Sequence, residues 1–546
     1  MKKYSIGIDY GTLSGRAVLV DLATGDEVVS SVFEYPHAVM DEQLPSGKKL
    51  PDNYALQHPQ DYLDVLKNTI PDILNKSGAT PEEIAGIGID FTACTVLPVY
   101  ADGTPLCFND KYKDEPHAYV KLWKHHAAQK QAEIIYEKAK EQNESWLKRY
   151  GDQISSEWFF PKILQVLEEN IELYHETARF IEAGDWITWV LTGKETHSSC
   201  LAGYKAFWSK KDGYPSNDFF ASVNPELGEI IGTKVSENVI SVGSKAGELC
   251  EAGATLTGLT QGIAVASPSI DAHAALPATG ITDSGKMLMI MGTSTCHIIM
   301  GDSEKCVPGI SGVVEDGVCE GYFGYEAGQS CVGDSFEWYT KSCLPKSYYD
   351  EAAAQNINIH KLLREKAKKL KVGESGLVAL DWWNGNRSIL SDSDLTGLIL
   401  GFKLTTKPEE IYRALIESTA YGTKVIIDNY EENGINIIEI FAAGGIAEKD
   451  EMTMQIYSDV MNKEIRISAS SQSCALGSAM FGAVAGGAFG NIKEAASIMA
   501  RVKDVLYKPI PENVRLYEKL YNEYKILHDY FGKGGNDIMK RLKEIK

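Results

Sequence analysis

The sequence predicts an α/β fold built from two related domains. Strand-like and helix-like segments alternate along the chain, which is typical of layered α/β structures with mixed sheets. The chain has 546 residues, and a single hydrophobic core stops growing near roughly 250–300 residues, so two large domains are expected. An apolar strand that runs into Gly-Thr and a hydroxyl residue occurs at 5–14 and again at 287–295. This repeat indicates two related halves that meet near 277–286, with a chance likeness of two short strings as the alternative.

The first half is expected to begin with strands and to continue through helices. Alternating apolar residues and glycine turns predict three strands that form a β-meander, then a helix and a further strand. In chain order, the expected strands are 4–9, 16–21, 27–33 and 84–90, and the first helix is 59–75. Residues 110–195 are interpreted as a mainly helical block, of the kind that often shapes a small-molecule pocket, with helices at 118–126, 131–141, 161–169 and 186–191.

The second half is expected to repeat the strand pattern and to end in a helix. Two apolar strands, at 287–291 and 297–300, flank the second Gly-Thr turn. An apolar strand at 437–441 precedes a helix at 450–460, and the Lys- and Glu-rich tail at 501–546 is predicted to be helical.

The charge and the cysteine pattern exclude several classes of function. A formal charge of −21 repels phosphate backbones and anionic lipid heads, so neither nucleic acid nor membrane is expected as a partner. Asp9 interrupts the apolar stretch that a signal peptide needs, and a cytoplasmic location is expected. The ten cysteines form no CxxC pair and are expected to be reduced thiols. The histidines form no HExxH motif, so any metal is expected to have oxygen ligands.

The two Gly-Thr turns are candidate phosphate-binding hairpins. A hairpin with glycine and threonine at its tip presents backbone N–H groups and a hydroxyl in one direction, which suits phosphate oxygens. Two such hairpins that face one another would hold a polyphosphate, and ordinary β-turns are the alternative. The candidate nucleotide-binding residues here are Gly11, Thr12, Gly292, Thr293 and Ser294.

Two further positions follow strands and precede helices. Gly444 and Gly445 stand at a strand-to-helix turn, where the lack of a Cβ atom lets a flat adenine approach the backbone. A tight turn or a helix cap is the alternative. Asp271 follows an apolar strand at 263–266 and precedes a run of small residues that starts a helix, so on local pattern it is equally well an N-cap.

Together these residues resemble the FGGY carbohydrate kinases, which have the actin/Hsp70-type ATPase fold. Both hairpins and the glycine turn at 443–445 sit at that family's spacing. The resemblance spans residues 5–477 and is carried by these strings: Asp90-Phe-Thr-Ala93-Cys-Thr, Leu122-Trp123-Lys124, Ser155-Ser156-Glu157-Trp158-Phe159, Ala202-Gly203-Tyr204-Lys205, Ile270-Asp271-Ala272-His273, Gly292-Thr-Ser-Thr-Cys296, Glu326-Ala-Gly-Gln-Ser330 and Cys474-Ala475-Leu476-Gly477.

The resemblance implies a fold and an activity. The fold is two actin/Hsp70-like (ribonuclease H-like) ATPase domains with a cleft between them and helical insertions in the first. The expected units are a sugar-binding domain at 1–283, a nucleotide-binding domain at 284–500 and a helical tail at 501–546 packed on the second domain. The implied reaction is ATP-dependent, Mg²⁺-assisted phosphorylation of L-ribulose at O5, a step of L-arabinose catabolism. The alternatives are another FGGY kinase, acting on D-ribulose or ribitol, or an actin- or Hsp70-like nucleotide switch.

The resemblance also implies roles for individual residues. Asp271 becomes the catalytic base, and Asp271 and Asp9 become the metal-site residues, with Asp9 acting through water. Lys205, Glu326 and the backbone of Ala93 are implied to bind the sugar together with Asp271. The sugar and MgATP are the expected partners, and the sequence leaves open whether the chain forms a homodimer.

Some positions depart from the family or have a plainer interpretation. Asn462 stands where many relatives carry glycine, and 384–387 replaces a commoner Gly-Glu-Arg string, so the adenosine contacts are the less defined part of the site. Trp123, Trp158 and Trp186 are interpreted as helix packing rather than as stacking platforms for the sugar.

Overall fold

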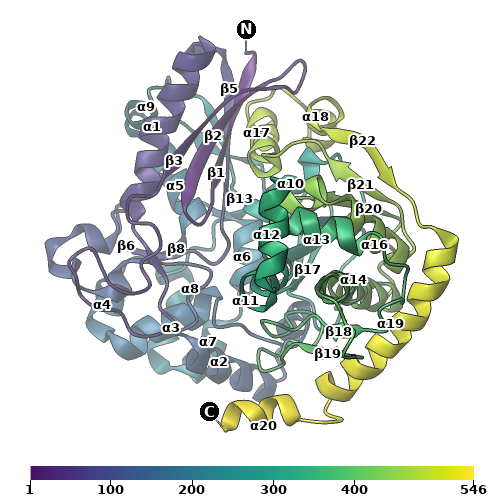
Figure 1. Cartoon of the computed structure of the whole chain (residues 1–546). Helices are drawn as coiled ribbons and strands as arrows, with labels where there is room; N and C mark the ends of the chain where they lie inside the picture. The colour runs from purple at the N-terminus through teal and green to yellow at the C-terminus, as the bar shows by residue number, and fades with distance from the viewer. Residues whose placement is uncertain (1, 546) are drawn as a thin grey trace.

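Two large mixed sheets form the framework of the chain. The computed structural model describes residues 2–545, and within them each half carries one seven-stranded sheet. Figure 1 shows the first half, purple to blue, beside the second half, green to yellow. Helices and strands alternate through both halves, so the predicted α/β architecture is confirmed.

The first sheet begins as the predicted meander. β1 (Tyr4–Tyr10), β2 (Ser14–Asp21) and β3 (Glu27–Glu34) pair antiparallel in sequence order. β5 (Ile84–Phe91) pairs parallel with the other side of β1. β12 (Ala264–Ala266) pairs parallel with β5, and β11 (Lys245–Glu248) pairs antiparallel with β12. The strand order is therefore β11-β12-β5-β1-β2-β3.

The second sheet repeats the connections of the first. β14 pairs antiparallel with β15, β15 with β17, and β20 then pairs parallel with β14. β21 is parallel to β20 and β22 is antiparallel to β21, as β12 and β11 are in the first sheet. Because order and direction both recur, the predicted internal repeat is structural. The strands are β14 (Lys286–Met291), β15 (Thr295–Gly301), β17 (Phe323–Gln329), β20 (Glu439–Ala443), β21 (Ile465–Ser468) and β22 (Val502–Tyr507).

Two helices join the halves by close backbone contact. α17 (Ser473–Ala485) lies on the first sheet, and a Cβ atom at Gly7 would stand 1.8 Å from a carbonyl oxygen of α17. α10 (Asp271–Ala278) packs on α17 just as closely, since a Cβ at Gly477 would stand 1.7 Å from a carbonyl oxygen of α10. Only small residues permit this approach. The start of α10 therefore lies at the junction of the two halves.

Residues 118–126, predicted as a helix, instead contain the strand β7 (Val120–Lys121). β7 belongs to a four-stranded sheet of order β4-β7-β6-β8, so the block predicted to be mainly helical is mixed. Lys121 pairs with Leu56, a distant partner that no local pattern can reveal. The other helices predicted in this block are present, with slightly different ends, as Gln129–Glu141, Phe159–Glu169 and Ala183–Thr192.

The C-terminal tail begins with a strand, so the purely helical prediction for 501–546 is wrong at its start. β22 adds to the edge of the second sheet because β21 offers it an antiparallel partner. Beyond β22, the described tail forms the two helices α19 (Pro511–Gly532) and α20 (Ile538–Glu544). α19, yellow in Figure 1, packs on α14 (Pro408–Glu432) and α16 (Glu451–Met461) of the second half.

All ten cysteines are free thiols, as their spacing predicts. Among residues 2–545, no helix combines the length and the low charge that are needed to cross a bilayer.

Candidate active site

Three aspartates converge where parallel strands of the first sheet end. β5 runs parallel beside β1, and their register places Asp90 next to Asp9. β13 (Ser269–Ile270) pairs with the end of β5, and Asp271 follows it as the first residue of α10. The carboxyl ends of parallel strands are the usual ligand site in open α/β sheets. The fold thus assembles one acidic cluster from three distant segments.

Asp271 lies in the first turn of α10 but does not occupy its N-cap position. Ile270 holds that position, and its side chain makes no capping hydrogen bond. The Oδ1 atom of Asp271 accepts a hydrogen bond from the backbone N–H of Ala272 at 2.6 Å. This bond fixes the carboxylate while its second oxygen stays available to a ligand.

The surroundings of the three carboxyl groups disfavour the charged forms of these groups. Burial, and next the negative charge of Asp9, raise the pKa of Asp271 to about 7. Burial also raises the pKa of Asp9, although Arg16, whose Nε lies 3.2 Å from Asp9 Oδ2, opposes the shift. Asp90 is fully buried, and burial together with Asp9 raises its pKa well above the usual value. A nearby cation would relieve this concentration of acidic groups.

The acidic cluster fits a hydrated divalent cation. Ser478 donates to Asp90 Oδ2 at 2.7 Å, whereas Asp90 Oδ1 is buried without a hydrogen-bond partner. In residues 2–545, no group of three or more His, Cys, Asp or Glu side chains is arranged to hold a metal ion by itself. Mg²⁺ keeps several waters and usually binds one or two carboxylates plus substrate phosphates. The donors present here suit that mode of binding.

Lys205 and Glu326 form a buried ion pair between the two halves. Lys205 ends α6 (Ser199–Lys205) of the first half, and Glu326 lies in β17 of the second. The Nζ atom of Lys205 is 3.1 Å from both carboxylate oxygens of Glu326. Arg387 makes a second ion pair with Glu326, and His273 Nε2 lies 3.6 Å from Glu326 Oε2. Lys205 and Glu326, which the family resemblance assigns to the sugar, thus lie in contact.

Lys205, Arg387, Glu326 and His273 form a basic cluster, which carries a net positive charge. Although burial raises the pKa of Glu326, Lys205 and Arg387 outweigh it and hold that pKa at about 2. Burial lowers the pKa of His273 to about 4, so this imidazole is neutral at neutral pH. Two cations therefore surround one carboxylate, and the charge of Lys205 acts on Asp271, which places the basic cluster within electrostatic reach of the acidic one.

Both Gly-Thr turns are closed by a backbone hydrogen bond from their glycine, but the first turn is one residue longer than the second. The backbone N–H of Gly11 donates to Ser14 O at 3.0 Å, and that of Gly292 donates to Ser294 O at 2.9 Å. In the second turn, the N–H of Val332 also donates to the carbonyl oxygen of Thr293, at 2.8 Å. Each turn closes a β-hairpin, β1–β2 or β14–β15, as the sequence predicts.

Trp123 lies in a turn and not in a helix, so its interpretation as a helix-packing residue is wrong. It is 39% exposed, and its Nε1 donates to the hydroxyl of Thr12 at 3.2 Å. Gln57 holds the same hairpin tip by donating to the carbonyl oxygen of Thr12 at 2.7 Å. Trp158 and Trp186 are buried, as the packing interpretation predicts.

The two glycines that follow β20 differ in their surroundings. Gly444 has a φ of 93°, and a Cβ there would stand 2.5 Å from Met291 O, so close packing on β14 requires a glycine. A Cβ at Gly445, the first residue of α15 (Gly445–Lys449), would meet nothing within 4 Å. Gly445 is therefore the one of the pair that leaves open space for a ligand.

Ala93 lies in the turn between β5 and β6 (Val96–Val99). Its side chain packs against the apolar cluster that includes Leu201 and Tyr204 of α6, the helix that ends in Lys205. The fold thus brings Ala93 near the basic cluster.

Sequence reasoning missed Asp90, Arg387 and His273 as members of the site. Asp90 had a signal, because Gly88-Ile-Asp90 repeats the Gly7-Ile-Asp9 of β1. Arg387 belongs to the 384–387 string, which was interpreted as lying towards the nucleotide; its ion pair with Glu326 places it beside Lys205 instead, so that interpretation is wrong for Arg387. His273 stands in the same string as Asp271, but no role was given to it.

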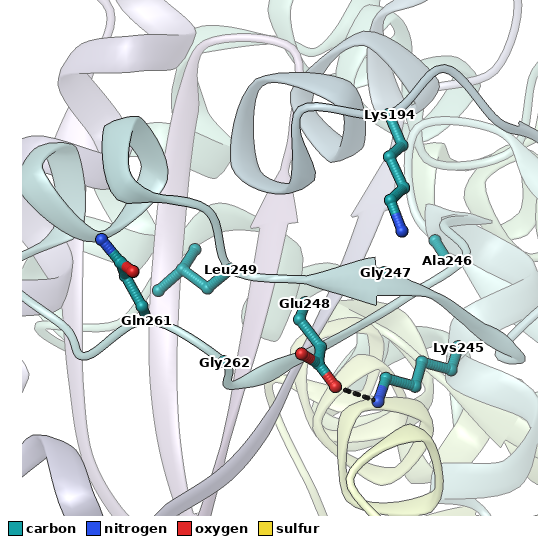
Figure 2. A pocket seen from close by; sticks show the side chains of 8 residues that line it. All are labelled: Lys194, Lys245, Ala246, Gly247, Glu248, Leu249, Gln261 and Gly262. Carbon is teal, nitrogen blue, oxygen red and sulfur yellow. Dashed lines mark hydrogen bonds and ion pairs between the residues drawn. The ribbon is translucent and has the colours of Figure 1, made fainter.

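A surface hollow of about 770 Å³ lies apart from these residues. It follows the edge strand β11 and is lined by Lys194, Lys245–Leu249, Gln261 and Gly262. Figure 2 shows Lys194 on one side of β11 and the Lys245–Glu248 ion pair on the other. No residue of the acidic or basic cluster lines it, so it is not part of the candidate active site.

Comparison with known proteins gives a consistent result over the full length. The N-terminal and C-terminal domain models of the FGGY family of carbohydrate kinases match residues 4–277 and 287–486. A ribulokinase from Bacillus licheniformis is 57% identical over 539 residues, which cover 98% of each chain. A ribulokinase from Halalkalibacterium halodurans is 52% identical over 549 residues, covering 100% of this chain and 98% of the relative.

The fold is also found among solved structures. A xylulose kinase from Lactobacillus acidophilus superposes with a TM-score of 0.81 at 18% identity, over 97% of this chain and 99% of that one. This likeness shows a shared two-domain fold.

Proposed function

We propose that this chain, which belongs to the FGGY family of carbohydrate kinases, phosphorylates L-ribulose at O5 with ATP and releases L-ribulose 5-phosphate and ADP. Its relatives of 52–57% identity over the full length are ribulokinases, and this supports ribulose as the substrate. The observation that carries the mechanism is the Asp271 carboxylate, which lies at the start of α10 and whose pKa responds to the charges of Asp9, Glu326 and Lys205.

Asp271 is the group placed to accept the proton. When O5 attacks the γ-phosphorus of ATP, an O5–P bond forms, the bond from that phosphorus to the ADP oxygen breaks, and the hydroxyl proton moves to Asp271. Phosphoryl transfer has a loose transition state that depends mainly on positioning and charge neutralisation. A carboxylate whose pKa is near neutrality suits late acceptance of this proton.

The hairpins and the glycine turn are proposed to hold the nucleotide. Gly11 and Thr12 from one side, and 292–294 from the other, would bind the phosphates, while Gly445 leaves room for the adenosine and Gly444 shapes the turn. Asp9, through water, and Asp271 would hold Mg²⁺, an ion that offsets phosphate charge when it is bound.

The basic cluster is proposed to hold the sugar. Lys205 and Glu326 each keep hydrogen-bonding capacity beyond their mutual ion pair, because an ammonium has three donors and a carboxylate about four acceptor sites. Ala93 would offer its backbone to the sugar. Since Lys205 and Glu326 come from different halves, a sugar bound there would contact both domains, and closure would exclude competing water.

Three wider features belong to the same proposal. We place the domain boundary near residue 283, with the nucleotide domain at 284–500 and the tail beyond it, and we place the reaction in the cytoplasm and in L-arabinose catabolism.

The reaction is tested by a coupled ADP-release assay with MgATP and a panel of L-ribulose, D-ribulose, ribitol and L-arabitol. The highest kcat/KM is expected for L-ribulose. A clear preference for another compound of the panel would overturn the substrate, and ATP turnover indifferent to every compound would indicate a nucleotide switch.

A further inference from the structure

Lys162 is a buried lysine whose side-chain nitrogen bonds to backbone carbonyls rather than to a carboxylate. It lies in α3 (Phe159–Glu169) with no exposed surface, and in residues 2–545 it forms no ion pair. Its Nζ atom donates instead to three backbone carbonyls, those of Cys94 at 2.5 Å, Leu122 at 2.9 Å and Lys121 at 3.4 Å. Burial lowers the pKa of Lys162, while the charges of Glu182 and Glu157 act in the opposite direction. Burying an ammonium group is costly unless its hydrogen-bonding capacity is satisfied, and these three carbonyls satisfy it.

One of these bonds holds the turn that carries Ala93. Cys94 has a φ of 55°, a left-handed conformation that a non-glycine residue keeps only when its surroundings enforce it. Lys162 holds the carbonyl of Cys94, and from the other side Glu182 Oε2 accepts the N–H of Thr95 at 2.8 Å. A buried lysine and a buried glutamate thus hold, from two sides, the turn that carries Ala93.

The other bonds hold the segment that supports the first phosphate hairpin. Lys162 holds the carbonyls of Lys121 and Leu122, and the next residue is Trp123. The indole of Trp123 donates to the hydroxyl of Thr12 at 3.2 Å. A single ammonium group is therefore bonded to two segments, one bordering the proposed sugar site and one bordering the proposed phosphate site.

We propose that Lys162 is a positioning residue that sets the Ala93 turn and the Thr12 hairpin relative to one another, and so aligns the sugar with the phosphates. The inference rests on the proposed function through the roles given to Ala93 and Thr12. Lys162 touches neither substrate in this account and acts through the backbone that it holds.

The test compares Lys162→Met with the matched control Lys234→Met. Lys234 also gives its ammonium to backbone carbonyls of the first half, those of Tyr174 at 2.9 Å and of Thr177, but neither segment borders the site. For the parent and both variants, steady-state kinetics are recorded with L-ribulose and MgATP varied in turn, together with the thermal unfolding midpoint.

Lys162→Met is expected to lower kcat/KM for L-ribulose by about tenfold or more, mainly through a higher KM for the sugar, and to raise the KM for ATP. Lys234→Met is expected to lower the unfolding midpoint while both KM values stay within about twofold of the parent. A lysine with a merely structural role would behave like Lys234. A folded Lys162→Met protein with both KM values within about twofold of the parent would therefore overturn the proposal.

If Lys162→Met does not fold, Trp123→Phe decides, because Trp123 is partly exposed and phenylalanine keeps an aromatic ring but lacks the N–H that donates to Thr12. The KM for ATP should rise while the KM for L-ribulose stays within about twofold, and an unchanged KM for ATP would overturn the proposed link. The parent separates the two proposals. A parent protein that phosphorylates no pentulose would overturn both the proposed function and the role of Lys162. An active parent together with variants whose KM values are unchanged would overturn only the role of Lys162.

Discussion

Asp9 and Asp90 are register partners on the adjacent parallel strands β1 and β5, and each ends a Gly-Ile-Asp sequence. The next residues, Tyr10 and Phe91, stack their rings with centroids 4.6 Å apart. The Asp9 side chain is 15% exposed, whereas Asp90 is fully buried. Asp9 is therefore the carboxylate that a ligand can reach, and the buried Asp90 lies beside it in the sheet.

The first prediction concerns the pH dependence that Asp9 imposes on Asp271. A base works only when it is deprotonated, so kcat/KM, which reports the free enzyme, should fall as the pH drops through about 7, the raised pKa of Asp271. The charge of Asp9 contributes to that rise, so Asp9→Asn should move the acidic limb of the profile to lower pH while lowering the overall rate. A limb that stays in place in Asp9→Asn would show that Asp9 does not act on the titrating group.

The second prediction concerns the ion pair between the halves. Lys205→Met or Glu326→Gln should lower kcat/KM for L-ribulose by about 10–150-fold, the equivalent of about 1.5–3 kcal/mol for a hydrogen bond to a charged group. The slow ATP hydrolysis measured without sugar should change little. Lys210→Met is the control, because Lys210 also joins the halves, through Glu315 and Asp316, but is 47% exposed. Equal losses in Lys205→Met and Lys210→Met would refute a sugar-binding role for Lys205.

The third prediction separates Gly444 from Gly445. Gly445→Val should raise the KM for ATP with little change in the unfolding midpoint, because its side chain would enter open space. Gly444→Val should lower the midpoint, because a Cβ there would stand 2.5 Å from Met291 O on a backbone with a φ of 93°. Thermal unfolding and ATP titration of both variants give the comparison. Normal ATP binding in Gly445→Val would remove the glycine turn from the nucleotide site.

The fourth prediction concerns the paired hairpins. Gly11→Val and Gly292→Val should each weaken ATP binding, because the new side chain stands where phosphate oxygens would approach the turn. A Cβ at Gly292 would make ordinary contact at 3.8 Å, and one at Gly11 would require a small shift because it would stand 3.3 Å from Ser14 O, so both folds should survive. Calorimetric titrations with ATP and, separately, with L-ribulose in the absence of nucleotide measure both affinities. Loss of sugar binding beside intact ATP binding would reverse the roles given to the two sites.

The sequence predicts the elements whose signals are local. The strand periodicity around Asp9 and around 287–291 correctly gives both hairpins and the internal repeat. Residues 118–126 were wrongly predicted as helical because their conformation depends on the pairing of Lys121 with Leu56, and β22 was missed because it depends on β21. Pairing between distant segments overrides local propensity in such places.

The same distinction holds for the site. The roles expected for Asp9 and Asp271 came from the family resemblance, since the local pattern of Asp271 fits an N-cap equally well. Arg387 reaches Glu326 from an irregular segment far along the chain. Lys162 is a lysine within an otherwise apolar helix start, and only the folded backbone shows which carbonyls it holds. Chemistry that depends on long-range backbone contacts has no signature in a single sequence.

The most direct test of the account is the turnover of Asp271→Asn with L-ribulose and MgATP. Asparagine keeps the shape of the side chain and its hydrogen bond to the N–H of Ala272 but cannot accept the proton from O5. The account predicts that kcat falls by about 10²–10⁴-fold, the range for loss of a general base, while calorimetry shows ATP still bound. A kcat close to that of the parent would contradict the assignment of Asp271 as the base, and with it the mechanism.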